Sequence, residues 1–252
     1  SSGSHELDAM WGGGFFRDSV ILVSGATGTG KTLTVTQFLA GAGAGDRCLL
    51  LAFEESRDQL FRNAIGWGVD FERMEKEGRL RVVCDYPEVA GLEEWLIRIK
   101  AEVEEFGPTR VALDSLSALE RGGSIKAFRE FVIGLTSFIK HQEITGLFTS
   151  TTASLMGGTS ITESHISTLT DSIILLRYVE TFGEMKRGLT VLKMRGSRHD
   201  KDIREFTIDA EGIHLGRAFR HVTGILAGTP THVSPADIER IWTHFEADQS
   251  RL

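Results

Sequence analysis

The chain has 252 residues, of which 41% are apolar and 25% charged, and its net charge is −7. These proportions exclude a disordered chain, and the length fits one large α/β domain or two small ones. No apolar run is long enough to span a membrane, the first ten residues lack the pattern of a signal peptide, and the acidic balance disfavours nucleic acid as a partner. Cys48 and Cys84 lie in apolar runs, which predicts buried thiols in a reducing compartment, the cytoplasm.

Short apolar runs alternate with amphipathic helical patterns through the first 150 residues. Apolar strands separated by helices predict a parallel sheet that helices cover on both faces. The predicted strands are 19–24, 47–53, 80–84, 110–113 and 146–151, and the predicted helices are 31–42, 56–67, 93–106 and 125–142.

The second half has a different pattern. Residues 153–160 predict a loop, and the strands expected at 172–180, 189–194, 203–208 and 212–215 are typical of antiparallel hairpins that extend the sheet. Residues 219–235 are irregular, and a helix is predicted from Pro235 to the end of the chain. We therefore divide the chain into a domain over residues 1–232 and a helical tail over 233–252.

The strongest motif is the run Gly25–Thr32, which reads GATGTGKT and lies between a predicted strand and a predicted helix. This is the phosphate-binding loop of ATPases, in which backbone N–H groups surround the phosphates. Lys31 is expected at the β- and γ-phosphates of ATP, and the Thr32 hydroxyl on Mg²⁺. The predicted nucleotide contacts in this loop are Gly25, Thr27, Gly28, Thr29, Gly30, Lys31 and Thr32.

Three carboxylates follow strands that belong near this loop. Asp114 ends a buried strand and is placed to hold Mg²⁺, although an acid here also caps the next segment. Glu54 and Glu55 follow the neighbouring strand. They either orient or deprotonate a nucleophile near the γ-phosphate, or they cap the helix that begins near Ser56. The candidate magnesium ligands are Thr32, Glu54 and Asp114.

With these residues in hand, the chain resembles the RecA-like ATPases and, within them, the KaiC family of circadian clock proteins. The resemblance covers roughly residues 1–232 and is strongest to the C-terminal, kinase half of such proteins. It rests on GGGFF at 12–16, the phosphate-binding loop, FEES at 53–56, DSLSAL at 114–119, EITGLF at 143–148, ITESHISTLTDSIILL at 161–176 and KMRGSRHDK at 193–201.

The resemblance implies a RecA-like fold and a homohexamer that binds ATP and Mg²⁺ between subunits. It also implies KaiB-like, and in some members KaiA-like, protein partners, and an ATPase half preceding this one in the parent protein. In the kinase half, Ser167 and Thr168 correspond to the residues that accept phosphate from the ATP of the adjacent subunit, and Thr162 to a local partner or minor acceptor. Without the resemblance, these hydroxyls fit β-favouring and capping residues equally well.

Further roles come from the same resemblance. Glu54 corresponds to the general base that Glu55 supports. Lys193 and Arg195 correspond to residues that reach the γ-phosphate on the adjacent subunit, and Trp67 and Arg187 to positions near the adenine.

The chain departs from the family at three places. Glu163 replaces a common Asp, and residues 149–155 differ from the usual string. In the tail, Ile238, Ile241, Phe245 and Leu252 have a spacing typical of coiled coils. This predicts packing against other subunits, rather than or besides binding of a KaiA-like protein; the alternative is a short helix folded on its own domain.

The sequence therefore predicts an ATP-dependent serine/threonine autokinase, with autophosphatase and ATPase activity, of a clock or timer. One alternative is a DNA-binding ATPase, for which the basic segment 186–201 is the candidate surface. The other is a hexamer that hydrolyses ATP without phosphorylating itself.

Overall fold

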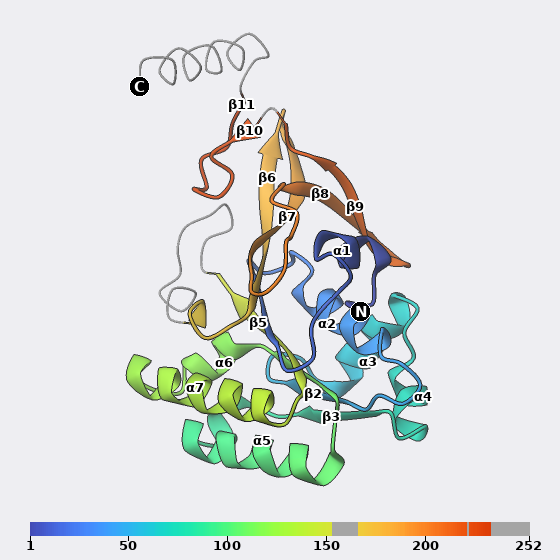
Figure 1. The fold of residues 1–252 in the computed structure, drawn as a ribbon, viewed down its shortest axis with the longest axis vertical. Coiled ribbons are helices and arrows are strands. Elements are labelled where there is room, and N and C mark those ends of the chain that lie inside the picture. Colours follow the sequence, from blue (N-terminus) through green and yellow to red (C-terminus); the bar gives the residue numbers. More distant parts are fainter. Residues whose placement is uncertain (153–165, 221, 233–252) are drawn as a thin grey trace.

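The computed structural model describes residues 1–152, 166–220 and 222–232, and its main feature is one large sheet (Figure 1). The strand order is β3-β2-β4-β5-β1-β6-β7-β8-β9. The first six strands of that order, which include β1 and β2, run parallel. Strands β7, β8 and β9 continue the sheet in antiparallel pairs. The bounds are β1 (Val20–Gly25), β2 (Cys48–Ala52), β3 (Leu80–Cys84), β4 (Arg110–Asp114), β5 (Thr145–Thr151), β6 (Ser172–Thr181), β7 (Glu184–Met194), β8 (Arg204–Asp209) and β9 (Gly212–Ala218).

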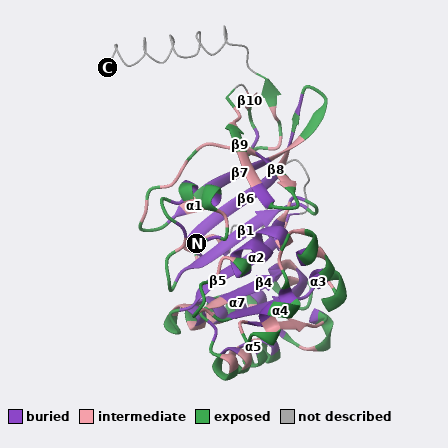
Figure 2. Cartoon of the chain, turned by 90° about the vertical axis from the view of Figure 1, so that its right-hand side faces the viewer, coloured by how far each residue is buried: buried purple, intermediate pink, exposed green. Residues whose placement is uncertain are grey.

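Helices cover both faces of the sheet and bury its central strands (Figure 2). One core joins the sheet to α1, α2, α3 and α4, and a second joins it to α5, α6 and α7. These helices are α1 (His5–Met10), α2 (Lys31–Ala40), α3 (Arg57–Gly66), α4 (Phe71–Lys76), α5 (Leu92–Phe106), α6 (Leu116–Glu120) and α7 (Ile125–His141), with a 3₁₀ turn η1 (Pro87–Val89). None of the described helices is long and apolar enough to cross a membrane.

The predicted fold class is confirmed: the domain has a mainly parallel sheet with antiparallel strands after it. The short helices α1, α4 and α6 were not predicted, because five or six residues are too few to show a helical period. Strand β7 begins five residues before the expected strand, at the exposed residues Glu184 and Met185, where no apolar run marks it. The irregular region contains the short pair β10 (Val222–Thr223) and β11 (Thr231–His232). The predicted loop at 153–160 and the tail lie outside the described residues.

Local signals explain where the long helices begin. The Ser124 hydroxyl accepts a hydrogen bond from the N–H of Ala127 and caps α7, whose buried face carries Phe128, Phe131 and Leu135. This spacing places large apolar side chains on one stripe against the sheet. Helix α2 starts differently, directly after a left-handed glycine, Gly30, because it continues from the loop that follows β1.

The end of α2 is held by close backbone packing. The Arg110 guanidinium donates to the carbonyls of Phe38 at 2.7 Å and Gly41 at 3.1 Å. A Cβ atom on Gly41 would lie 2.5 Å from the Cα of Gly3, a distance that real Cβ atoms do not adopt. Glycine is therefore required at 41 by contact, although its φ of −73° suits any residue.

We expect Gly41→Ala to lower the free energy of unfolding by about 1–3 kcal/mol, because two backbone segments must separate to admit the methyl group. Gly45→Ala is the matched control, since nothing lies within 4 Å of a Cβ there, and its effect should stay within about 0.5 kcal/mol. Denaturant unfolding of both variants checks this. Equal stability of the two variants would contradict the close packing at Gly41.

Candidate active site

The phosphate-binding loop joins β1 to α2 and depends on its glycines. Gly28 and Gly30 have φ of 79° and 110°, which side chains rarely adopt. A Cβ on Gly25 would lie 2.6 Å from the carbonyl oxygen of Leu176 on β6, so this position is closed to any other residue. The loop therefore presents backbone N–H groups and the amino end of α2 on its open side, an arrangement that favours anions.

Lys31 is the cation of this loop. Its Nζ donates to the carbonyls of Gly25 at 2.9 Å and Ala26 at 3.0 Å, and the side chain is buried. Burial lowers the pKa of Lys31, while the carboxylates of Asp114 and Glu54 oppose that shift. The amine is thus held beside the loop and balanced against two acids of the same site.

Asp114 lies at the carboxyl end of β4, and both of its oxygens accept hydrogen bonds. Oδ2 accepts from the Thr32 hydroxyl at 2.8 Å, and Oδ1 accepts from the Thr149 hydroxyl on β5. Thr149 was not predicted to take part; no signal beyond its place in a buried strand marks it. A hydroxyl and a carboxylate side by side fit Mg²⁺, which takes one or two protein ligands and completes its shell with water and phosphate oxygens. The described residues contain no cluster of three or more acidic, histidine or cysteine side chains that could hold a metal ion.

Glu54 and Glu55 follow β2 and have different surroundings. Glu54 is 36% exposed and lies 3.6 Å from the guanidinium of Arg121. Glu55 is half-buried and accepts a hydrogen bond from Asn63 on α3 at 3.1 Å. Burial raises the pKa of Glu55, and the charges of Asp114 and Glu54 raise it further, against the Asn63 hydrogen bond, which lowers it.

One cavity of about 380 Å³ brings the loop and the acids together. Trp67 follows the end of α3, and Arg187 lies on β7 with its guanidinium 5.8 Å from the Tyr178 ring. Both residues line this cavity, although they are far from the loop in sequence. The lining residues are Thr27, Gly28, Gly30, Lys31, Thr32, Leu33, Glu54, Glu55, Trp67, Asp114, Thr151, Arg187 and Ile208.

Leu33, Thr151 and Ile208 were missed by sequence reasoning. Ile208 Cδ1 lies 3.0 Å from where a Cβ on Gly30 would be, so β8 packs over the loop. Only the alternation of Phe206 and Ile208 in a predicted strand could have suggested that one face of β8 turns toward the site.

Ser167 and Thr168 lie elsewhere, in a turn between Ile166 and Thr170 that precedes β6. Lys193 Nζ donates to the carbonyls of Ser167 and Thr170, both at 2.7 Å. The Arg195 guanidinium donates to the carbonyl of Thr168 at 3.0 Å. The structure therefore brings Lys193 and Arg195 together with this turn.

The turn and the phosphate-binding loop lie at opposite edges of the sheet. Strands β1 and β6 are parallel, with Ile21 beside Ser172 and Gly25 beside Leu176. At about 3.3 Å per residue, these two levels are about 13 Å apart. The loop continues beyond the second level and the turn precedes the first. Accordingly, none of Ser167, Thr168, Lys193 and Arg195 lines the 380 Å³ cavity.

Comparison with known proteins assigns the family. Residues 1–218 match the family model described as "ATPase: KaiC". The chain belongs to the KaiC family. It is 69% identical over 242 residues to the circadian clock protein KaiC3 of Synechocystis sp., a match that covers 96% of this chain and 48% of that protein. It is 58% identical to the circadian clock oscillator protein KaiC of Acaryochloris marina, covering 96% and 47% of the two chains.

A third relative is the circadian clock oscillator protein KaiC of Thermostichus vulcanus, with 60% identity over 93% of this chain and 45% of that protein. The chain thus spans about half the length of the curated relatives it matches. The KaiC ATPase domain implies that the phosphate-binding loop binds a nucleotide.

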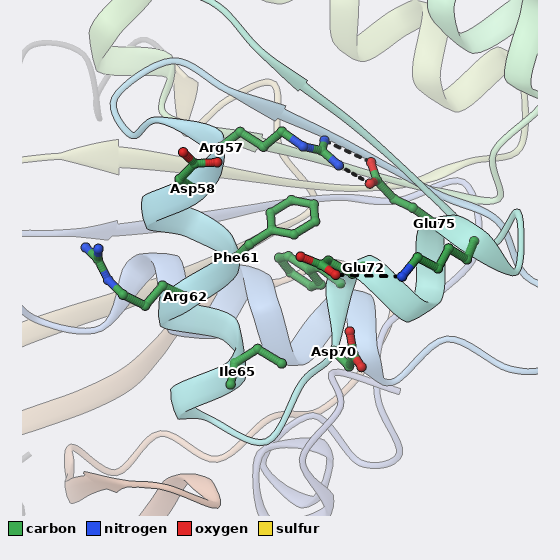
Figure 3. A pocket seen from close by; sticks show the side chains of 10 residues that line it. Arg57, Asp58, Phe61, Arg62, Ile65, Asp70, Glu72 and Glu75 are labelled. Carbon is green, nitrogen blue, oxygen red and sulfur yellow. Dashed lines mark hydrogen bonds and ion pairs between the residues drawn. The ribbon is translucent and has the colours of Figure 1, made fainter.

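A larger cavity of about 690 Å³ lies between α3 and α4 of this KaiC-family domain, outside the nucleotide site (Figure 3). Its charged side chains largely pair with one another: Arg57 with Glu75, and Lys76 with Glu72. The cavity lacks a phosphate-binding loop and an Asp at a strand end. The volume of a cavity therefore does not identify the candidate nucleotide site in this domain.

Removal of the charge of Glu55 should stabilise the nucleotide-free domain. Folding raises the pKa of Glu55, so the protonated carboxyl contributes to the stability of the folded state at low pH. This contribution is lost as the pH rises through the folded pKa and the carboxyl ionises. We expect Glu55→Gln to have a higher thermal midpoint than the wild type at pH 8, and a much smaller difference at pH 4, below the ordinary carboxyl pKa of 4.5. Thermal unfolding across this range checks the prediction, which a pH-independent difference would contradict.

Proposed function

We propose that this chain is an ATP-dependent serine/threonine autokinase of the KaiC type, which also hydrolyses ATP and removes its own phosphates. It transfers the γ-phosphoryl group of ATP to Ser167 and Thr168 of an adjacent copy. The proposal is carried by one observation: the acceptor turn and the phosphate-binding loop lie at opposite edges of one rigid sheet. Transfer within one chain would have to cross that sheet, whereas transfer between copies does not.

The reaction uses groups already gathered in the 380 Å³ cavity. The acceptor hydroxyl oxygen attacks the γ-phosphorus, its proton passes to Glu54, and the bond to the bridging oxygen breaks to release ADP. Lys31 stays beside the β- and γ-phosphates and stabilises the charge that develops there. Thr32 and Asp114 would hold Mg²⁺, which neutralises phosphate charge when bound; Glu54 remains a third candidate ligand. The reverse of this step returns phosphate to ADP.

Exposure favours Glu54 over Glu55 as the base. A base must come within hydrogen-bond reach of the hydroxyl that it deprotonates. A hydroxyl from another copy approaches from outside, where Glu54 is the more exposed carboxylate. Glu55 is half-buried and accepts a hydrogen bond from Asn63.

A ring of identical copies satisfies this geometry. When the edge that carries Ser167 and Lys193 faces the cavity of the next copy, each interface uses two different surfaces, and such interfaces form a ring when the rotation from copy to copy closes. We propose a homohexamer, in which Lys193 and Arg195 reach the γ-phosphate across the interface and Trp67 and Arg187 lie near the adenine. KaiB-like partners, and a KaiA-like partner in some systems, are proposed on the same family grounds.

The contacts of the basic segment disfavour the DNA-binding alternative. Lys186 pairs with Glu205 at 3.2 Å, Arg187 lines the nucleotide cavity, and Lys193 donates to two carbonyls. These three cations already have partners or a site within the chain, which leaves fewer free charges in the segment for a nucleic-acid backbone.

Intact mass after incubation with Mg²⁺ and ATP tests the proposal. We expect one or two added phosphates, mapped to Ser167 and Thr168. Glu54→Gln should slow their appearance by at least about a hundredfold, because a general base contributes that much or more. Glu72→Gln, at an exposed ion pair on α4, is the control and should react like the wild type. ADP release with no phosphate on the protein would instead establish an ATPase without autokinase activity.

Two variants mixed together test transfer between copies. Glu54→Gln chains keep the acceptors, and chains carrying Ser167→Ala with Thr168→Ala keep the base. We expect phosphate on the Glu54→Gln chains in the mixture and almost none on either variant alone. A mixture no more active than its components would contradict transfer between copies.

A further inference from the structure

Asp171, which follows the acceptor turn, is fixed from several sides. Its side chain is 18% exposed, and both carboxylate oxygens lie 2.8 Å from Lys140 Nζ. Oδ2 also accepts from the N–H of Val20 at 2.9 Å. The backbone N–H of Asp171 donates to the Val20 carbonyl, and its carbonyl accepts from the N–H of Arg195. Asp171 therefore ties the turn to the start of β1 and to the segment after β7.

Lys140 comes from a helix that packs against the sheet. It lies in the last turn of α7, the helix whose buried face packs on the sheet. A cation at a helix C-terminus is favoured by the helix dipole. The ion pair thus connects Asp171, which follows the acceptor turn, to helix α7 rather than to another loop.

The Arg195 guanidinium is shared between two acceptors. Its Nη2 donates to the Thr168 carbonyl at 3.0 Å, whereas its Nη1 lies 3.8 Å from Asp171 Oδ1. Lys140, at 2.8 Å, has the shorter contact with the carboxylate. Because Lys140 holds the Asp171 carboxylate, Arg195 has only the 3.8 Å contact with Asp171 and keeps its 3.0 Å hydrogen bond to the Thr168 carbonyl.

We propose that Lys140 and Asp171 are positioning residues for the acceptor pair, because Lys140 neutralises Asp171 and so keeps Arg195 on the Thr168 carbonyl. This inference rests on the proposed function, since the turn that they position is the one that receives the phosphoryl group. Without Lys140, the uncompensated carboxylate attracts Arg195 away from Thr168. The acceptor hydroxyls and the guanidinium then lose their fixed relative positions. Small misplacements of reacting groups lower the rate by large factors.

The charges around Lys193 are consistent with this arrangement. Burial lowers the pKa of Lys193, and the positive charges of Arg195 and Lys140 lower it further, while Asp171 raises it. Asp171 therefore pairs with Lys140, lies 3.8 Å from Arg195 and acts electrostatically on Lys193. Loss of either member of the Lys140–Asp171 pair changes the balance for the other two cations, both of which bind the acceptor turn.

Mixed assemblies separate a positioning role from a merely structural one. Lys140→Met is placed either in the acceptor chains, together with Glu54→Gln, or in the donor chains, together with Ser167→Ala and Thr168→Ala. We expect transfer to fall about tenfold or more when the substitution is in the acceptor chains, and to stay within about twofold when it is in the donor chains. Lys126→Met, at an exposed ion pair on the same helix, is the matched control and should have no effect in either chain.

Two further variants keep the test decisive. Lys140→Arg preserves the charge and should restore most of the transfer, and Lys140→Gln serves if the methionine variant does not fold. Asp171→Asn removes the competing charge, so adding Lys140→Met to it should cost less than Lys140→Met costs alone.

The outcomes distinguish the two proposals. Equal losses in donor and acceptor chains would show a structural role and overturn the positioning role, as would full activity of Lys140→Met in the acceptor chains. Absence of phosphate when the unsubstituted donor and acceptor chains are mixed would overturn the proposed autokinase, and with it this inference.

Discussion

The register between β1 and β6 is the constraint on which the rest of the structure depends. Strand β1 is buried along its whole length and pairs in parallel with β5 on one side and β6 on the other. A shift by one residue would turn the buried side chains of β6 to the opposite face of the sheet, so the register is strongly specified. It fixes the phosphate-binding loop at the carboxyl edge and the acceptor turn at the amino edge. The length of the strands therefore separates the loop from the acceptor turn of the same chain.

The site at the carboxyl edge concentrates like charges. Asp114, Glu54 and Glu55 lie around one cavity in which Lys31 is the cation that contacts the loop carbonyls. Asp114 is satisfied by two hydroxyl donors, whereas burial raises the pKa of Glu55 and the charges of Asp114 and Glu54 raise it further. Repulsion of this kind is tolerable where a metal ion and a polyphosphate complete the site. The two carboxylates that raise the pKa of Glu55 are the groups that bind Mg²⁺ and deprotonate the acceptor in the proposed reaction.

Much of this arrangement could be predicted from the sequence, because its signals are local. The motif GATGTGKT defines the loop, and continuous apolar runs define the parallel strands, so the fold class and the place of Asp114 followed directly. Residues that join the site by crossing the sheet have no local signal. Thr149 and Ile208 belong to strands whose patterns show only burial, and their contacts with Asp114 and the loop exist only after β5 and β8 take their places. Trp67 and Arg187 came from family resemblance, which carries three-dimensional information that spacing lacks.

Two cations contact the backbone of the acceptor turn, and this suits a reaction with two neighbouring acceptors. Lys193 and Arg195 donate to the carbonyls of Ser167, Thr168 and Thr170. These hydrogen bonds do not use the hydroxyl oxygens, so the carbonyl acceptors are still present after one hydroxyl has taken a phosphate. In the proposed reaction the backbone can thus hold the turn for a second transfer, while the new phosphate adds a negative charge that attracts the same cations. A frame built on the hydroxyls themselves would be lost at the moment one of them reacted.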